Sequence, residues 1–399
     1  MATSGRAFPL AGGVFPPALL LTGVLLTGCS SAGPGPAPTP DAASATSASR
    51  SPQATGSPSG PGPRTLAAAC EVRLPAPWSS ALAAGEVRTP PGERAVLSDA
   101  GPGWTAVQLT GSGRRRAALV EAGGGSPRTL LAFDDPVAHQ LLAADYDGRR
   151  WAAFAVLEGR TLDSPWSLYV WDGTTGTARR LTHADRPGPL PRPVVSGGTV
   201  HWAQGVGDGE ATVYAAPVAG GEPRAVHTGV MDTPFAAGGL LVWRESAGPT
   251  TRLSAVSLRG LRSAALPAPL AALRDLRSVV SDGTTWAWVA GETEPRLMVW
   301  RTGDARPTAV VTTSPAVDGM DQLRISGRLI TWRTPETSYA LDLGSLSYTR
   351  ITPAYGYAQA GDGALAVAYS LGDAKADGSR SVIQVVDAGR LPALPGCGG

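Results

Sequence analysis

Short stretches of alternating apolar and polar residues, separated by turns rich in glycine and aspartate, run through the chain from about residue 95 onward. Alternation with a period of two, bounded by Gly and Asp, predicts β-hairpins. In one such hairpin, Ser167–Trp171 is followed by a turn at Asp172-Gly173 and then by Ala178–Leu181. Helical periodicity is nearly absent, apart from short segments at Trp78–Ala84 and Leu270–Leu276. The pattern therefore predicts an all-β fold.

The alternating segments form a repeat of about 44 residues, in which a small-residue turn precedes a strand with an aromatic residue. Four units align on tryptophans spaced 41, 45 and 44 residues apart, namely Trp202, Trp243, Trp288 and Trp332. A closely matching unit begins at Tyr146, and weaker copies begin at Gly101 and Gly361. A short apolar strand before each turn makes four strands per unit. Four strands in about 44 residues, repeated seven times, predict a seven-bladed β-propeller with four-stranded blades over residues 65–399.

One unit is similar to the repeat of TolB-like propellers, a WD40/PD40-type family. It contains Tyr146-Asp147-Gly148, a strand with Trp151 and Phe154, the segment Leu168-Tyr169-Val170-Trp171-Asp172, and Leu181-Thr182. The family repeat has a small-Asp-Gly turn, a strand, a (Leu/Ile)-Tyr-Val-x-Asp strand and Leu-Thr. The other units have Gly-Gly or Gly-Arg where the family has Asp-Gly, and the α/β domain that precedes the propeller of TolB has no counterpart. The resemblance thus implies the fold, and the envelope partner of TolB is not carried over.

The aromatic residue at a fixed place in each unit predicts packing between adjacent sheets, because tryptophan contributes a large apolar area to a core. A ring of aromatic residues that stack on a ligand in the channel is the alternative.

The first 29 residues have the three parts of an export signal. Arg6 precedes a mostly apolar stretch, Val14–Leu26, which is too short to span a bilayer. Leu26-Thr27-Gly28-Cys29 follows and resembles the lipobox of bacterial lipoproteins, in which the cysteine thiol receives a diacylglycerol and a peptidase cuts before it. We therefore expect a lipoprotein signal peptide at 1–28 and a lipid on Cys29 that anchors the chain at the extracytoplasmic face of the cell membrane. An ordinary secreted protein with a chance cysteine is the alternative.

The segment 29–64 begins at the lipidated cysteine and continues with Pro, Ser, Ala, Thr and Gly, with almost no large apolar side chain. Such a composition cannot bury enough surface to offset its conformational entropy. We expect a disordered tether that holds the folded domain away from the membrane.

Cysteines remain at both ends of the folded part. If Cys29 carries the lipid, Cys70 and Cys397 are left in an oxidising compartment. A ring-shaped fold brings its two ends together, so we predict a Cys70–Cys397 disulfide that closes the ring. Two free thiols are the alternative.

Charge and motifs give few further indications. The net charge of +2 does not favour nucleic-acid binding, and Arg114-Arg115-Arg116 fits a solvated turn. No serine of the mature domain lies in a G-x-S-x-G motif, and the four histidines (His139, His183, His201 and His227) lack metal-ligand spacing. The Asp373–Ser379 segment has the start of a calcium loop, but Lys375 replaces a ligand, so a polar turn is expected. We therefore predict no catalytic residues, no metal, no cofactor and no enzyme activity.

The leading hypothesis for the function is a protein-interaction platform at the cell envelope, since the anchor implies a role at the surface and no reaction set is visible. The alternative is binding of a glycan or small ligand in the propeller funnel, and an enzyme ranks third. Charged residues clustered in the channel would favour ligand binding or catalysis, whereas a broad apolar patch on one face would favour a protein partner. A closed ring leaves few free strand edges, so we expect a monomer.

Replacing Cys29 by serine should remove the anchor. We expect the Cys29→Ser chain to leave the membrane fraction of expressing cells, while the wild-type chain stays in it until detergent is added. Fractionation followed by immunoblotting measures the difference, and a wild-type chain that is recovered without detergent would contradict the lipid anchor.

Overall fold

The computed structural model describes residues 66–399 except for positions 90, 112, 124, 136–138, 187, 249, 275, 291–295, 313–320, 372–379 and 399. The predicted signal peptide, the lipobox residues Leu26, Thr27 and Gly28, and Cys29 with its tether all lie outside the described residues. The Asp373–Ser379 segment lies outside them as well.

Four sheets contain four strands each. The first contains β3 (Arg94–Gly101), β4 (Trp104–Gly111), β5 (Arg114–Glu121) and β6 (Arg128–Phe133). The second contains β7 (His139–Tyr146), β8 (Trp151–Glu158), β9 (Trp166–Asp172) and β10 (Thr177–Ala184). The third contains β11 (Val194–Ser196), β12 (Thr199–Gly207), β13 (Glu210–Pro217) and β14 (Arg224–Gly229). The fourth contains β26 (Tyr357–Gly361), β27 (Ala364–Leu371), β28 (Arg380–Asp387) and, paired with β28, β2 (Glu86–Arg88).

A three-stranded and a nine-stranded sheet complete the described strands. The smaller one contains β15 (Phe235–Ala237), β16 (Leu240–Ala247) and β17 (Thr250–Ser257). The larger one contains β18 (Arg277–Ser281), β19 (Thr285–Ala290), β20 (Arg296–Arg301), β21 (Thr308–Thr312), β22 (Asp321–Ser326), β23 (Leu329–Arg333), β24 (Ser338–Asp342), β25 (Ser347–Arg350) and β1 (Leu66–Glu71). β1 pairs in parallel with both β21 and β25 and so joins two four-stranded groups. Hydrogen bonding within the described residues therefore gives six sheets, where the sequence predicts seven separate blades.

Helical structure is limited to α1 (Ala76–Ala84), α2 (Ala268–Ala271) and a 3-10 turn at Ala388–Arg390. Among the described residues, none of these helices is long and apolar enough to cross a membrane.

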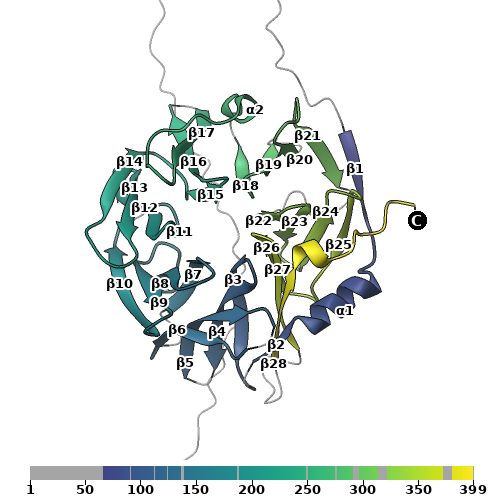
Figure 1. The fold of residues 1–399 in the computed structure, drawn as a ribbon, viewed down its shortest axis with the longest axis horizontal. Coiled ribbons are helices and arrows are strands. Elements are labelled where there is room, and N and C mark those ends of the chain that lie inside the picture. The colour runs from purple at the N-terminus through teal and green to yellow at the C-terminus, as the bar shows by residue number, and fades with distance from the viewer. Residues whose placement is uncertain are drawn as a thin grey trace, which may run out of the picture. The chain divides into compact units, whose positions relative to one another are not determined.

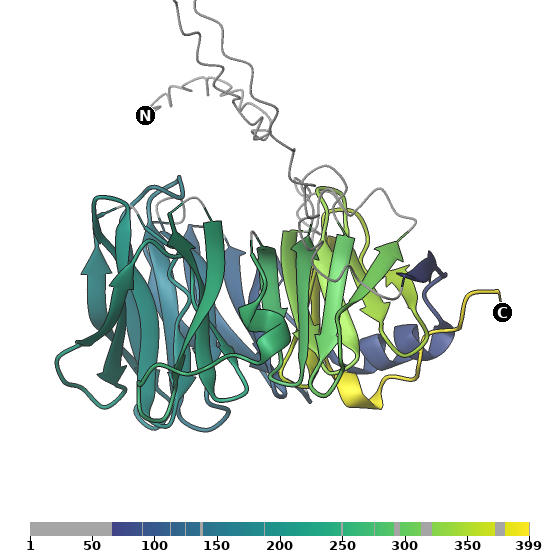
Figure 2. The ribbon, with the colours of Figure 1, turned by 90° about the horizontal axis from the view of Figure 1, so that it is seen from above.

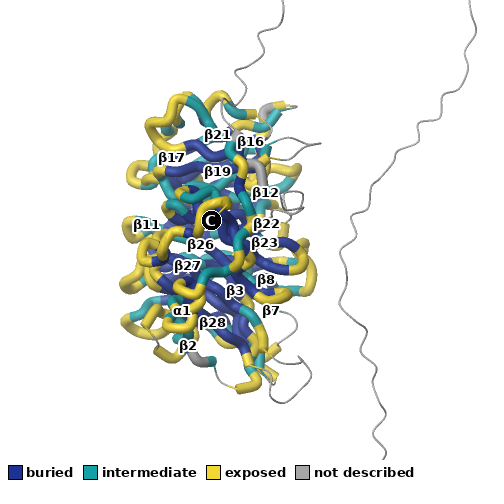
Figure 3. The backbone as a smooth tube through the Cα atoms, turned by 90° about the vertical axis from the view of Figure 1, so that its right-hand side faces the viewer, coloured by how far each residue is buried: buried dark blue, intermediate teal, exposed yellow. Residues whose placement is uncertain are grey.

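The sheets of 66–399 are arranged around a common centre, with the first strand of each group innermost (Figure 1). Apolar clusters fill the space between successive sheets, and the strands carry the buried residues while the turns at their ends are exposed (Figure 3). One cluster contains Val107 and Leu109 of β4 together with Ile383 and Val385 of β28, so it closes the ring between the beginning and the end of the domain. This all-β ring of mostly antiparallel sheets is a β-propeller, as the sequence predicts.

The repeated tryptophans pack inside the ring, as predicted. Their exposed fractions are 0–1% for Trp202, Trp243, Trp288 and Trp332. The Trp202 ring stacks on Tyr214 with 5.6 Å between ring centroids, and the Trp332 ring stacks on Tyr339 at 5.4 Å. These side chains serve the core between sheets and do not form a ligand-stacking surface.

The two ends of the domain are held together by several contacts (Figure 2). A disulfide joins Cys70 to Cys397 with 5.8 Å between their Cα atoms, which is the pairing expected from the sequence. The indole of Trp78 on α1 donates to the carbonyl of Pro392 at 2.9 Å. β2 adds a strand from the N-terminal part to the sheet that contains the C-terminal strands. The ring is therefore closed by pairing, by packing and by a covalent bond.

Removing the disulfide should destabilise the domain because it spans 327 residues. Cross-linking across so long a loop restricts the unfolded chain, so we expect Cys70→Ser/Cys397→Ser to lower the free energy of unfolding by up to about 5 kcal/mol. Urea unfolding of the full chain in a Cys29→Ser background measures this, and wild-type protein with a reductant should match the double variant. Unchanged midpoints would contradict a stabilising bond.

Candidate functional site

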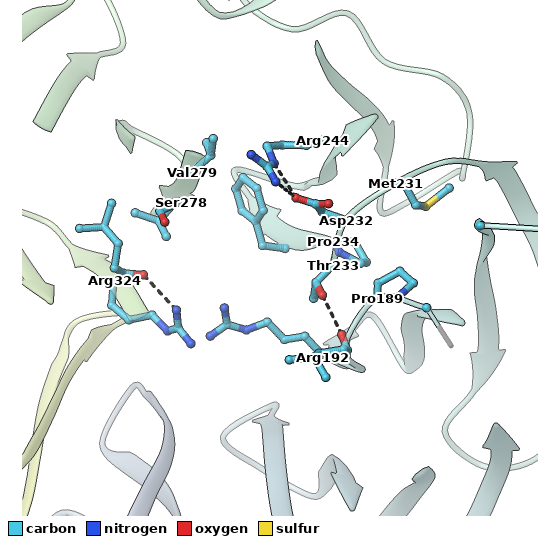
Figure 4. Close-up of a pocket in the computed structure, with 16 residues that line it drawn as sticks. Pro189, Arg192, Met231, Asp232, Thr233, Pro234, Arg244, Ser278, Val279 and Arg324 are labelled. Atoms are coloured by element: carbon cyan, nitrogen blue, oxygen red, sulfur yellow. Dashed lines mark hydrogen bonds and ion pairs between the residues drawn. The ribbon is translucent and has the colours of Figure 1, made fainter. Parts of the chain in front are cut away.

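A cavity of about 590 Å³ lies at the centre of the ring (Figure 4). Its wall includes the segment before β11, residues 231–235 at the start of β15, residues 278–280 of β18 and residues 323–324 of β22. A second cavity of about 130 Å³ shares Arg192, Phe235, Val280 and Arg324 with the first. The first strands β3, β7, β11, β15, β18, β22 and β26 all contribute to its wall. The two cavities together mark the central channel.

Close strand packing lines one side of this channel. Gly361, the last residue of β26, lies against the carbonyl of Ala100 in β3, and a Cβ atom at this position would collide with that oxygen. Only glycine fits there. The last and the first sheets of the ring therefore approach each other directly beside Asp99 and Asp362, which both line the smaller cavity.

Two arginines extend into the channel toward each other (Figure 4). Arg192 Nη2 donates to Asp99 Oδ1 at 2.9 Å, and Arg324 Nε lies 3.8 Å from the same oxygen. Arg324 Nη1 also donates to the carbonyl of Leu323 at 2.9 Å. Burial and the charge of Arg192 lower the pKa of Arg324 to about 9, which leaves it charged at neutral pH. Two guanidinium groups thus share one carboxylate.

A third arginine at the cavity wall has a partner of its own. Arg244 forms an ion pair with Asp232 and donates to the carbonyl of Leu276. Arg244 therefore has a carboxylate of its own, whereas Arg192 and Arg324 share Asp99.

Carboxylates line the other part of the channel. Asp145 Oδ2 accepts from the backbone N–H of Val195 at 2.7 Å, and Oδ1 accepts from that of Tyr146 at 2.9 Å. Burial raises the pKa of Asp145 to about 7, with a further contribution from the charges of Asp99 and Asp362, although the Val195 hydrogen bond opposes the rise. Desolvation and the charge of Asp282 likewise raise the pKa of Asp362. Asp145 therefore changes charge near neutral pH.

The four histidines considered in the sequence analysis do not line either cavity. His183 and His227 pair with Glu158 and Glu245, with His227 Nε2 2.6 Å from Glu245 Oε1. His201 is fully buried, and burial lowers its pKa to about 4, so it is neutral at physiological pH. His139 stacks on Phe133. In the part of the chain that the structure describes, no group of three or more His, Cys, Asp or Glu side chains could hold a metal ion.

Sequence reasoning assigned none of Asp99, Asp145, Arg192 and Arg324 to a site. A signal was present: a charged residue stands between apolar neighbours in the first strands, in Leu323-Arg324-Ile325 and in Ala144-Asp145-Tyr146. In a propeller, the first strand of each sheet borders the central channel. A charged side chain on such a strand can therefore lie close to charged side chains of other sheets, which are far away in the sequence. That interpretation requires the ring to be known first.

Neither a family model nor a curated protein sequence matches the chain. A solved prolyl endopeptidase structure is similar, with a TM-score of 0.51 and 14% identity, covering 76% of this chain and 48% of that one. The chain thus spans about half the length of that protein.

Two further solved structures have lower scores. The β-propeller domain of the Trilobed protease from Pyrococcus furiosus has a TM-score of 0.45 and 10% identity, covering 69% of this chain and 91% of that one. An oligogalacturonate lyase from Vibrio parahaemolyticus has a TM-score of 0.48 and 10% identity, covering 74% and 92%. At these identities the likeness shows the fold alone.

The prediction that the chain is not an enzyme, which was based on the lack of a catalytic motif, is wrong. A solved structure that shares the fold of the chain belongs to an enzyme, a prolyl endopeptidase. The physical reason is that a channel site in a ring takes single residues from several strands. Such residues are separated by whole repeats, so no contiguous motif marks them.

The raised pKa of Asp145 predicts a pH-dependent stability. Its pKa is about 7 in the folded protein and about 4 in an unfolded chain, so its stabilising contribution is complete below about pH 4 and is lost as the pH rises through 7. We expect the free energy of unfolding of Asp145→Asn, relative to wild type, to increase by about 2–3 kcal/mol between pH 5 and pH 8. Chemical unfolding at several pH values measures it. Asp163→Asn, at an exposed turn, is the control, and a flat difference for Asp145→Asn would contradict the shift.

Proposed function

We propose that this protein is a ligand-binding β-propeller of the cell envelope, whose central channel takes a small molecule. The observation that carries the proposal is the channel itself, where a cavity of about 590 Å³ has Arg192, Arg324 and Arg244 in its wall. Small-molecule sites are concave, measure about 300–1,000 Å³ and combine apolar walls with a few polar groups. This cavity has that size, and its wall combines apolar side chains with three arginines.

The distribution of charge and apolar surface favours this function over the interaction platform that the sequence suggested first. Charged residues gather in the channel, namely Asp99, Asp145, Arg192, Arg324 and Asp362. The large apolar side chains that are exposed in the described residues come from separate elements, namely Val96, Leu162, Leu190, Val230, Tyr355 and Leu371. The charged channel supports a ligand in the funnel.

We also propose that the ring has seven blades. Seven first strands border the smaller cavity, one from each predicted repeat. The nine-stranded sheet would then be two blades that share β1 at their outer edges. In the three-stranded blade, a bridge between Val256 and Ser263 stands in the place of a fourth strand.

The position at the envelope is supported by the sequence. The lipobox at Leu26–Cys29 and the Pro/Ser-rich segment after it support a lipid anchor and a tether, so the channel would meet ligands outside the cytoplasm.

Filling the channel should abolish ligand binding. Ala236 is exposed on β15 and lines the smaller cavity, so we expect the side chain in Ala236→Trp to occupy the space of a ligand. Native mass spectrometry of the full-length Cys29→Ser chain, after exposure to a small-molecule extract of cells, measures which molecules are retained.

The matched control is Ala225→Trp, at an exposed position on β14 outside the channel. Wild type and Ala225→Trp should retain the same small molecules, and Ala236→Trp should retain less than a tenth of them. A wild-type chain that retains nothing, or an Ala236→Trp chain that retains as much as wild type, would disprove the channel as a binding site.

A further inference from the structure

We propose that Arg192 and Arg324 bind an oxyanion of the channel ligand, the carboxylate or phosphate ester of a molecule whose remaining part is apolar. This inference rests on the proposed function and names the chemical class of the ligand. Its basis is the geometry of the two side chains, which come from the segment before β11 and from β22 and meet across the cavity (Figure 4).

Arg192 and Arg324 have more N–H donors than they use in hydrogen bonds to the described residues. Each guanidinium group has five N–H donors. Arg192 uses one of them on Asp99 Oδ1, and Arg324 uses one on the carbonyl of Leu323. Arg324 Nε is buried and has no hydrogen-bond partner among the described residues, since Asp99 Oδ1 is 3.8 Å away. Several donors of the two groups therefore remain available to a ligand.

The pair also shares a single contacting carboxylate. The side chains of Arg192, Arg324 and Asp99 are only 25%, 20% and 11% exposed, and among the described residues Asp99 is the carboxylate within ion-pair distance of both guanidinium groups, while Asp145 and Asp362 lie elsewhere in the channel wall. Other arginines of comparable exposure have a carboxylate each, such as Arg244 with Asp232 and Arg328 with Asp342. Partly buried charges are costly unless they are paired, so a second anion would be favourable here. Planar guanidinium groups suit carboxylates and phosphates, which accept two parallel hydrogen bonds.

Apolar side chains form part of the wall beside the arginines. Phe235 and Val280 line both cavities, and Leu323 and Met231 contribute to the larger cavity. The ring of Phe235 is fixed edge-on against Trp286, with 6.1 Å between centroids. A ligand held by its oxyanion would thus place its remaining part on a preformed apolar wall, which is why we assign an amphipathic anion and not an inorganic one.

Fluorine NMR of three matched probes tests the assignment. The probes are 4-fluorobenzoate, 4-fluorophenyl phosphate and the uncharged 4-fluorobenzamide, added to the full-length Cys29→Ser chain. We expect at least one charged probe to bind at least tenfold more tightly than the amide, and the two charged probes distinguish a carboxylate from a phosphate ester. Arg192→Gln and Arg324→Gln should each weaken that probe at least tenfold and weaken the amide far less, because the amide carries no charge. Arg390→Gln, at a side chain that is 87% exposed, is the control.

The outcomes separate this inference from the proposed function. Equal binding of the amide and the charged probes, lost in Ala236→Trp, would overturn the oxyanion site and leave a ligand-binding channel in place. Binding of all probes that survives Ala236→Trp would overturn both. If none of the three probes binds, the oxyanion site is overturned, and the extract screen alone decides on the channel.

A variant of Asp99 gives a second test, in which the stability of the variant is itself the measured quantity. Asp99→Asn removes the only carboxylate that the structure places against the pair, so the chain should melt at a lower temperature than wild type. The bound charged probe should then raise its melting temperature more than that of wild type, because the probe replaces the missing charge. An equal or smaller rise than in wild type would overturn the proposed role of the arginine pair.

Discussion

The inner edges of the first strands set the main constraint on this ring. Each first strand pairs with a neighbour on one side only, and the N–H groups on its other side need acceptors. Side chains of the preceding sheet supply them. The acceptors and the N–H groups they bind are Ser381 with Ala95, Gln108 with Leu141, Asp145 with Val195, and Thr331 with Ala360, at 2.7–2.9 Å. These four bonds fix β3, β7, β11 and β26 against the preceding groups of strands, and the apolar clusters fill the space between the sheets.

The same constraint explains why the ends of the domain are joined so firmly. The bond from Ser381 to Ala95 crosses from the last sheet to the first, so it exists only if the ring is closed. β2 pairs with β28 beside this contact, and the Cys70–Cys397 disulfide lies at the outer edge of the neighbouring group. An open ring would lose the inner-edge hydrogen bond and the core cluster around Val107 and Ile383 together. Closure therefore stabilises the channel as well as the termini.

The sequence predicted the parts of the fold that repeat. Turns with Gly and Asp, alternating strands and a tryptophan at a fixed place in four units were enough for an all-β ring with Trp202 and Trp332 in its core. The joining of two groups by β1 could not be predicted, because Leu66–Glu71 has no neighbour in sequence to pair with and finds its partners only in the finished ring. The channel charges were missed for the same reason, since Asp99, Arg192 and Arg324 lie in separate repeats and meet only at the centre.

The fold accounts for some of the polar side chains in the channel and leaves others without a structural role. Asp145 satisfies an N–H of β11, so its carboxylate is part of the ring and its raised pKa is a cost of that position. Arg324 has no such task, because its one direct hydrogen bond is to the carbonyl of the residue before it. Successive side chains of a strand point to opposite faces, so Arg324 of β22 borders the channel while Leu323 and Ile325 pack in the core between sheets. The buried charge of Arg324, which has no hydrogen-bonding role in the ring, is therefore consistent with the proposed binding of an anionic ligand.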